Sequence, residues 1–248
     1  MELTTFIIAV FCIIDDRLAD RRLRRRGPRP TLADSEVLTI ECVGEFLGID
    51  TDAGLYRYFR RHWANWFPGL RRVHRTTFTR QAANLWAIKQ HLHRHLLTQV
   101  HHDPQISLID SATVPICRFA RAYRCRRLRH EAAWGYDEVA KQTYLGLRAH
   151  LRVCWPGVIV AAELTPANVA DQAAAPDLLA DATGWALADR AYGSPHLAAE
   201  LRGQGVHLLA PPRGTRCRQR QPPWIIGKRR RIETVIGQLT GRYHLKQV

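Results

Sequence analysis

The chain has 248 residues, which suits one large or two small domains, and its 46% of apolar residues is sufficient for a hydrophobic core. Lys and Arg number 37 against 22 acidic residues, and the formal net charge of +15 favours a polyanionic partner, above all nucleic acid, over a membrane surface. Six cysteines without a C-x-x-C pair fit reduced thiols. The N-terminal apolar run 6–14 is too short to span a bilayer and lacks a preceding basic segment. We therefore expect a cytoplasmic, nucleoid-associated protein that does not bind membranes.

The first 104 residues are predicted to be helical and basic. Apolar periodicity predicts helices at 1–20, from Thr31 to Gly48, from Asp52, and from Thr76 to Val100. We assign residues 1–104 to an all-helical domain that binds DNA in a helix-turn-helix-like manner, although the pattern alone identifies no recognition helix.

An arginine run follows the first predicted helix, between Arg17 and Arg29. Its members that we predict to bind DNA are Arg22, Arg24, Arg25 and Arg26. Two interpretations remain open, a solvated loop and an arm that contacts phosphates, since arginine favours bidentate phosphate contacts.

Residues 105–248 alternate between strand and helix patterns. Strands are predicted at 106–109, 144–153, 158–164, 185–188 and 206–210, and helices at 171–179, 194–201 and 228–244. Asp171 is expected to be the N-cap of the first of these helices. The basic, proline-rich segment 211–223 is expected to be mobile. The fold class is therefore α/β, with a mixed five-stranded sheet that begins as an antiparallel meander and has flanking helices.

Three acidic residues stand out in this second half. Asp110 ends the first strand, Asp189 ends the fourth, and Glu233 lies on the last helix. Singly, each has a simpler interpretation, as a turn residue or as an ion-pair partner of Arg190 or Arg229. Together they predict a site at the ends of two neighbouring strands. Converging carboxylates favour Mg²⁺ or Mn²⁺, and two such ions support phosphoryl transfer.

The segments around these acids resemble a known family. The sequence blocks are 108–111 (LIDS), 187–193 (LADRAYG), 228–239 (KRRRIETVIGQL) and, on the second strand, 146–150 (GLRAH). They resemble the acidic blocks of DDE-class insertion-sequence transposases, most of all the insertion-sequence family numbered 982, which is related to those numbered 4 and 5. Arg229 matches the signature of family 4, whereas Ile226 and Thr240 stand where that signature has a tyrosine and a lysine.

The resemblance implies an RNase H-like catalytic domain that cleaves the ends of a DNA element and joins the freed 3′-OH to target DNA. It implies that Asp110, Asp189 and Glu233 form the catalytic, metal-binding triad. It also implies that the protein assembles as a homo-oligomer on the terminal inverted repeats. Further arginines predicted to contact DNA are Arg121, Arg124, Arg126, Arg148, Arg229 and Arg230.

Two alternatives remain open: an RNase H-like nuclease without strand transfer, and an inactive DNA-binding derivative of such an element. The end of the chain at Val248 comes sooner after Glu233 than the resemblance implies, so we also expect a shortened copy.

Overall fold

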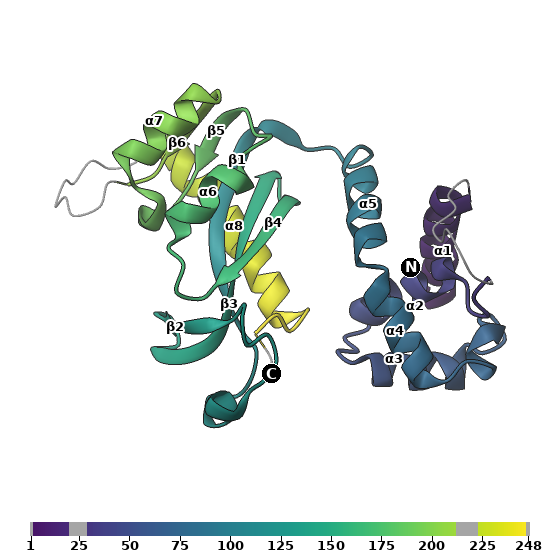
Figure 1. Cartoon of the computed structure of the whole chain (residues 1–248). Helices are drawn as coiled ribbons and strands as arrows, with labels where there is room; N and C mark the ends of the chain where they lie inside the picture. The colour runs from purple at the N-terminus through teal and green to yellow at the C-terminus, as the bar shows by residue number, and fades with distance from the viewer. Residues whose placement is uncertain (1, 20–28, 212–222, 247–248) are drawn as a thin grey trace. The chain divides into compact units, whose positions relative to one another are not determined.

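A computed structural model of the chain describes residues 2–19, 29–211 and 223–246. The chain divides into two compact units, Met1–Gln99 (unit 1) and Val100–Val248 (unit 2) (Figure 1). The predicted DNA-binding residues Arg22, Arg24, Arg25 and Arg26 lie outside the described residues, as does most of the predicted mobile segment 211–223. None of the described helices is long and apolar enough to cross a bilayer.

Unit 1 is helical throughout its described part, as predicted. Its elements are α1 (Leu3–Ala19), α2 (Asp34–Phe46), α3 (Asp52–His62), the 3₁₀ helix η1 (Pro68–Arg71), α4 (Arg75–Asn84) and α5 (Trp86–Leu97). One hydrophobic core joins them, and Phe59 and Phe78 are among its fully buried side chains. A buried polar contact fixes α4 against the start of α2, because Nε2 of Gln81 donates to the carbonyl oxygen of Leu32 at 2.9 Å.

The prediction of a single long helix from Thr76 to Val100 is wrong. The helix ends at Asn84 and a new one begins at Trp86. Leu85 between them is buried, and its backbone N–H donates to the carbonyl of Ala82, a tight closing turn. The apolar spacing continues at a helical period through this break, so periodicity alone could not reveal it.

Unit 2 is an α/β unit. Its strands are β1 (Asp103–Pro115), β2 (Ala133–Asp137), β3 (Gln142–Trp155), β4 (Val158–Pro166), β5 (Gly184–Leu187) and β6 (Val206–Leu209). Its helices are η2 (Phe119–Arg124), α6 (Asp171–Leu178), η3 (Arg190–Tyr192), α7 (Pro195–Gly203) and α8 (Pro223–Gly241). The predicted α/β class is confirmed, with a mixed sheet, flanking helices and a helical N-terminal part.

The sheet has the strand order β2-β3-β1-β5-β6, with β4 pairing with β3 off this path. β1, β3 and β4 pair antiparallel, as the predicted meander requires, whereas β1–β5 and β5–β6 are parallel. The sheet has six strands instead of the predicted five. The additional strand is β2, which pairs antiparallel with residues 142–146 of β3 and lies beside the arginine run that had been assigned no regular structure.

Alternating side chains of β1 face two different helical layers. Leu108 belongs to a cluster with Ile232 and Val235 of α8, whereas Ile109 belongs to a cluster with residues of α6 and α7. Because successive side chains of a strand point to opposite faces, α8 covers one face of the sheet near β1, and α6 and α7 cover the other.

Candidate active site

The register of β1 and β5 brings two of the predicted acids to one edge of the sheet. The strands are parallel, and Leu108 pairs with Leu187. Asp110 and Asp189 each lie two residues beyond this pair, in the same direction along neighbouring strands. The prediction that these two strands are neighbours is confirmed, and the two carboxylates lie at the carboxyl end of the parallel pair, where α/β proteins bind ligands.

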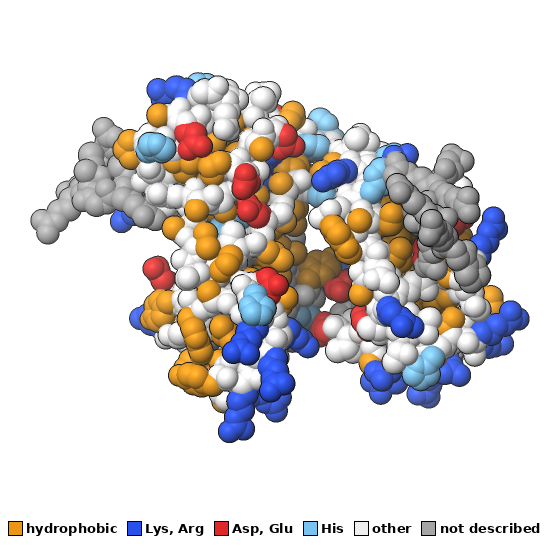
Figure 2. All heavy atoms as spheres, in the orientation of Figure 1, with side chains coloured by type: hydrophobic (Ala, Val, Ile, Leu, Met, Phe, Trp, Pro, Cys, Tyr) orange, Lys and Arg blue, Asp and Glu red, His pale blue; other side chains and the backbone are white. Residues whose placement is uncertain are grey.

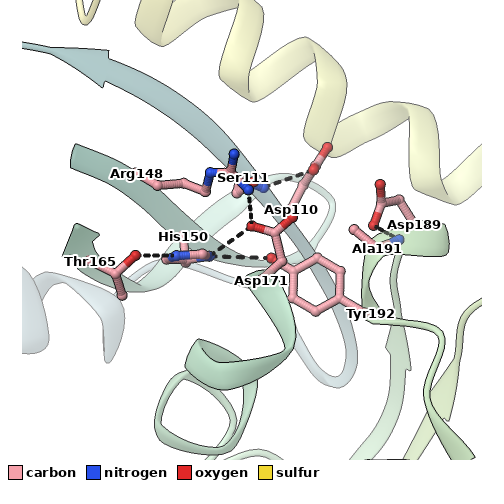
Figure 3. Close-up of polar contacts among 9 residues, drawn as sticks. All are labelled: Asp110, Ser111, Arg148, His150, Thr165, Asp171, Asp189, Ala191 and Tyr192. Atoms are coloured by element: carbon pink, nitrogen blue, oxygen red, sulfur yellow. Dashed lines mark hydrogen bonds and ion pairs between the residues drawn. The ribbon is translucent and has the colours of Figure 1, made fainter. Parts of the chain in front are cut away.

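Asp110 points toward α8. Its position, two residues after Leu108, gives it the same sheet face as that residue, and Figure 3 shows its carboxylate directed to the pale yellow helix α8. The backbone N–H of Ser111 donates to its Oδ1 at 2.8 Å. This hydrogen bond fixes one carboxylate oxygen and leaves the other for a ligand.

Asp189 ends β5 and begins the short helix η3. Its Oδ1 accepts the backbone N–H of Ala191 at 2.8 Å, so the carboxylate caps the turn (Figure 3). Gly193 closes this turn, and a Cβ at Gly193 would lie 2.2 Å from the carbonyl oxygen of Pro211. Only glycine therefore allows the segment after β6 to lie this close to the turn after Asp189.

Burial and neighbouring charge make ionisation of both aspartates costly. Desolvation, together with the negative charges of Asp189 and Asp171, raises the pKa of Asp110 to about 6 against the opposing effects of the Ser111 hydrogen bond and Arg229. Desolvation also raises the pKa of Asp189, together with the charge of Asp171, against the opposing charge of Arg229. The site therefore has an excess of negative charge that a cation would neutralise.

A divalent cation fits the chemistry of this pair. The ligands available are carboxylate oxygens, which Mg²⁺ and Mn²⁺ prefer. Among the described residues, however, no group of three or more His, Cys, Asp or Glu side chains is placed to hold a metal ion. The structure thus brings two carboxylates together and does not complete a three-ligand set.

Glu233 is the third predicted acid, and it lies on α8. α8 packs on β1 through the fully buried Ile232, next to Glu233 in the chain. The Glu233 side chain is 57% exposed, and its Oε1 lies 3.9 Å from Nη2 of Arg229, the i,i+4 ion pair foreseen as its simpler interpretation. Arg229 also lowers the pKa values of Asp110 and Asp189, so one guanidinium acts electrostatically on both aspartates and contacts Glu233.

A fourth carboxylate was misassigned from the sequence. Asp171 is not the N-cap of α6, because Ala170 holds that position. Instead Asp171 is buried, and its Oδ1 accepts from Nη1 of Arg148 at 2.9 Å and lies 3.7 Å from Nδ1 of His150 (Figure 3). The local sequence fits a cap equally well, and only the pairing of β3 with β4 brings these partners to Asp171.

His150 forms the centre of this buried cluster. Its Nε2 lies 2.9 Å from Oγ1 of Thr165 and its Nδ1 lies 3.5 Å from the hydroxyl of Tyr192. Desolvation lowers the pKa of His150, so the neutral ring is favoured. One sequence signal could have revealed the cluster: Arg148, His150 and Arg152 alternate with apolar residues on β3, which marks a polar row facing an internal partner.

The predicted DNA-contacting arginines fall into different environments. Arg121, Arg124, Arg126 and Arg230 are exposed. Arg148 is engaged by Asp171, and Arg229 by Glu233. The first group can therefore contact a ligand without breaking an ion pair to any residue that the structure describes.

The raised pKa of Asp110 has a consequence for folding stability. Ionisation costs more in the folded than in the unfolded chain, so the folded state is favoured below the ordinary pKa of 3.8 and loses this stability as pH rises through about 6. Asp110→Asn removes the charge, so it should raise the melting temperature of the metal-free protein above about pH 6. The gain should vanish below about pH 4.

Differential scanning calorimetry in EDTA across this pH range measures the effect. The matched control is Asp177→Asn, an exposed aspartate of α6. A lower melting temperature for Asp110→Asn at neutral pH would mean that the Asp110 carboxylate stabilises the fold, contrary to this account.

Comparisons with known proteins give a family match for this chain. A family model described as a transposase DDE domain matches residues 100–247, more than half of the chain. A search of the curated proteins finds no match. Among solved structures, the chain is similar to a cryo-EM structure of the piggyBac transposase synaptic complex with hairpin DNA, with 13% sequence identity and a TM-score of 0.37. The match covers 91% of this chain and 43% of that chain, so the chain spans less than half of that protein's length.

Proposed function

Because the chain belongs to the family of transposases with a DDE domain, we propose that it cleaves the ends of a DNA element and joins the freed 3′-OH to target DNA. The observation that carries this proposal is the placement of Asp110 and Asp189 side by side, two residues beyond the last pair of β1 and β5. Helix α8, which carries Glu233, packs against the face of β1 on which Asp110 lies.

Asp110, Asp189 and Glu233 are the residues that would hold Mg²⁺ or Mn²⁺ in this proposal. Two bound ions supply activation of the attacking oxygen and stabilisation of the leaving oxygen. The chain's own contribution is orientation, since the backbone N–H groups of Ser111 and Ala191 fix the two aspartates. Glu233 would complete the set if its carboxylate left its ion pair with Arg229.

The proposed reaction consists of two displacements at phosphorus. In the first, water attacks the phosphate at the element end, the P–O3′ bond breaks, and a 3′-OH is released. In the second, this 3′-OH takes the place of water and attacks a phosphate of the target. A new phosphodiester forms while a target 3′-oxygen leaves.

The proposal includes DNA as partner on more than one surface. The exposed arginines Arg121, Arg124, Arg126 and Arg230 would contact phosphates in unit 2. Unit 1, with its basic N-terminal stretch, would bind the terminal inverted repeats as the DNA-binding domain. Assembly of a homo-oligomer would bring two element ends together.

Strand transfer separates this proposal from a plain nuclease. A precut element end with a free 3′-OH should be joined to a supercoiled plasmid in Mg²⁺ or Mn²⁺, and gel electrophoresis detects the joined product. Ca²⁺, which coordinates more loosely, should support DNA binding with little chemistry.

The control is the same DNA with a 3′-deoxy end, which lacks the attacking oxygen and should give no product. Equal joining of both DNAs, or cleavage without joining, would replace the proposal by the nuclease alternative. DNA binding with neither cleavage nor joining would favour the inactive derivative.

A further inference from the structure

Three aromatic side chains gather on the surface of unit 2, away from the aspartate pair. Phe119 and Tyr123 of η2 pack against Trp134 of β2, with ring centroids 6.0 Å and 5.6 Å from that of Trp134. Their exposed fractions are 56%, 86% and 40%. We call these three residues the aromatic platform. Large aromatic rings that contact one another and water are uncommon on protein surfaces, and such patches often mark binding sites, so we consider which ligand this platform binds.

The surroundings of the platform are strongly basic. Between Phe119 and Trp134 the chain has exposed arginines at positions 121, 124, 126, 127 and 129, and no acidic residue occurs between Arg118 and His130. Figure 2 shows hydrophobic and Lys or Arg side chains next to each other at the lower end of unit 2, where Figure 1 draws β2. Guanidinium groups bind phosphates, and exposed rings stack on bases.

We propose that the aromatic platform binds unpaired nucleotides of DNA by stacking bases on Tyr123 and Trp134 while the neighbouring arginines bind the phosphates. Duplex DNA presents its phosphates but keeps its base faces stacked inside, so it can use the arginines and not the rings. An apolar protein partner would leave the arginine charge without compensation. The platform therefore favours single-stranded over duplex DNA.

The platform and the aspartate pair belong to the same sheet. β1 continues from Asp110 to Pro115, a distance of about 17 Å at 3.3 Å per residue, and η2 begins at Phe119 after the short connection 116–118. The Oγ1 of Thr113 donates to buried Asp137 at 2.7 Å, which ties the end of β2 to β1. The choice of DNA as the nucleic acid rests on the proposed function, whereas the stacking site itself does not.

The test measures DNA binding by the full chain in EDTA, so that it does not depend on cleavage. The probes are a fluorescent oligothymidine strand and a duplex of equal length. Tyr123→Ala and Trp134→Ala should each weaken binding of the single strand about 5- to 150-fold, the range for loss of one base–aromatic stack. Duplex affinity should change less than about twofold, since phosphate contacts remain. Tyr123→Phe and Trp134→Phe, which keep a ring, should restore most of the affinity.

Matched controls separate stacking from charge and from folding. Trp185→Ala removes another exposed tryptophan of unit 2, on β5, and should leave both affinities unchanged. Arg124→Gln should weaken both probes and lower the salt dependence by about one phosphate contact. Tyr123 is the safest position because its ring is largely exposed, so loss of binding there does not report unfolding.

A second readout follows one base directly. A 2-aminopurine in the single strand should lose fluorescence on binding to the wild type through stacking, and Trp134→Ala should prevent this loss. Wild-type affinity for the single strand in both alanine variants, an equal loss for the duplex, or no binding of either DNA by the wild type would overturn the proposal. Selective single-strand binding in EDTA, combined with neither cleavage nor joining in a separate assay with Mg²⁺ or Mn²⁺, would uphold the platform and contradict the transposase proposal instead.

Discussion

Asp110→Asn and Asp189→Asn should each lower DNA cleavage at least about 1,000-fold, since several kcal/mol of transition-state stabilisation are lost with one metal ligand. Both substitutions preserve side-chain size and remove the charge. The hydrogen bonds from Ser111 and Ala191 can persist, because an amide oxygen still accepts them. The expected loss is therefore chemical and not structural.

Cleavage of an end-containing duplex in Mg²⁺ measures this effect, and a gel-shift assay should give unchanged DNA affinity. Asp177→Asn on the surface of α6 is the matched control and should retain full activity. Glu233→Gln should reach the same loss as the two aspartate variants. Activity within about tenfold of the wild type for any one of the three would remove that residue from the proposed triad.

Asp171→Ala should lower the free energy of unfolding of unit 2 by about 3 kcal/mol, because removal of one partner from a buried ion pair leaves the other uncompensated. Asp171 is buried, and the Arg148 side chain is 21% exposed, so the guanidinium cannot fully hydrate after the loss. His150, which is fully buried, loses its nearby carboxylate in the same variant. The loss should be detectable as a shift of the urea midpoint at an unchanged slope.

Asp171→Asn is the matched control for this prediction. Its amide oxygen can still accept from Arg148, so the loss should be clearly smaller than for alanine. Equal losses for both variants would show that the charge of Asp171 matters and the hydrogen bond does not. A change below about 0.5 kcal/mol for alanine, the range of surface substitutions, would mean that the buried pair contributes nothing to stability.

The sequence predicted the aspartate pair because its determinants are local. Residues 106–109 and 185–188 read as short apolar strands, each followed closely by an aspartate. The prediction that Asp110 ends the first strand is wrong, because β1 continues to Pro115 by pairing with β3; only the pairing of β1 with β5 ends before Asp110, at Leu108. The sequence did not predict their pairing; a shared site only required that the two strands be neighbours, and the register of Leu108 with Leu187 shows that they are.

The features that were missed depend on contacts between segments far apart in the chain. β2 contains two exposed aromatic residues, Trp134 and Tyr136, so its burial pattern carries little hydrophobic signal. The break between α4 and α5 falls at Leu85, which is itself buried. The helical spacing of apolar residues therefore continues through the break, and the sequence gives no sign of it. Asp171 fits a helix cap locally, and its actual partners come from β3.

The charge of Arg229 acts on both Asp110 and Asp189, so it links the binding of a cation at these aspartates to the binding of a phosphate at Arg229. Its positive charge opposes the rise in the pKa values of Asp110 and Asp189 that burial causes, so the chain supplies a partial counterion to both carboxylates. A cation that binds the aspartates has to compete with this guanidinium. A phosphate that engages Arg229 withdraws it from them. Under the proposed function, a cation and a phosphate would therefore strengthen each other's binding, and reciprocity requires the same factor in both directions. If the proposal holds, the midpoint of a Mg²⁺ titration should differ between the protein with DNA and the protein without it, and the value with DNA would describe the proposed reaction.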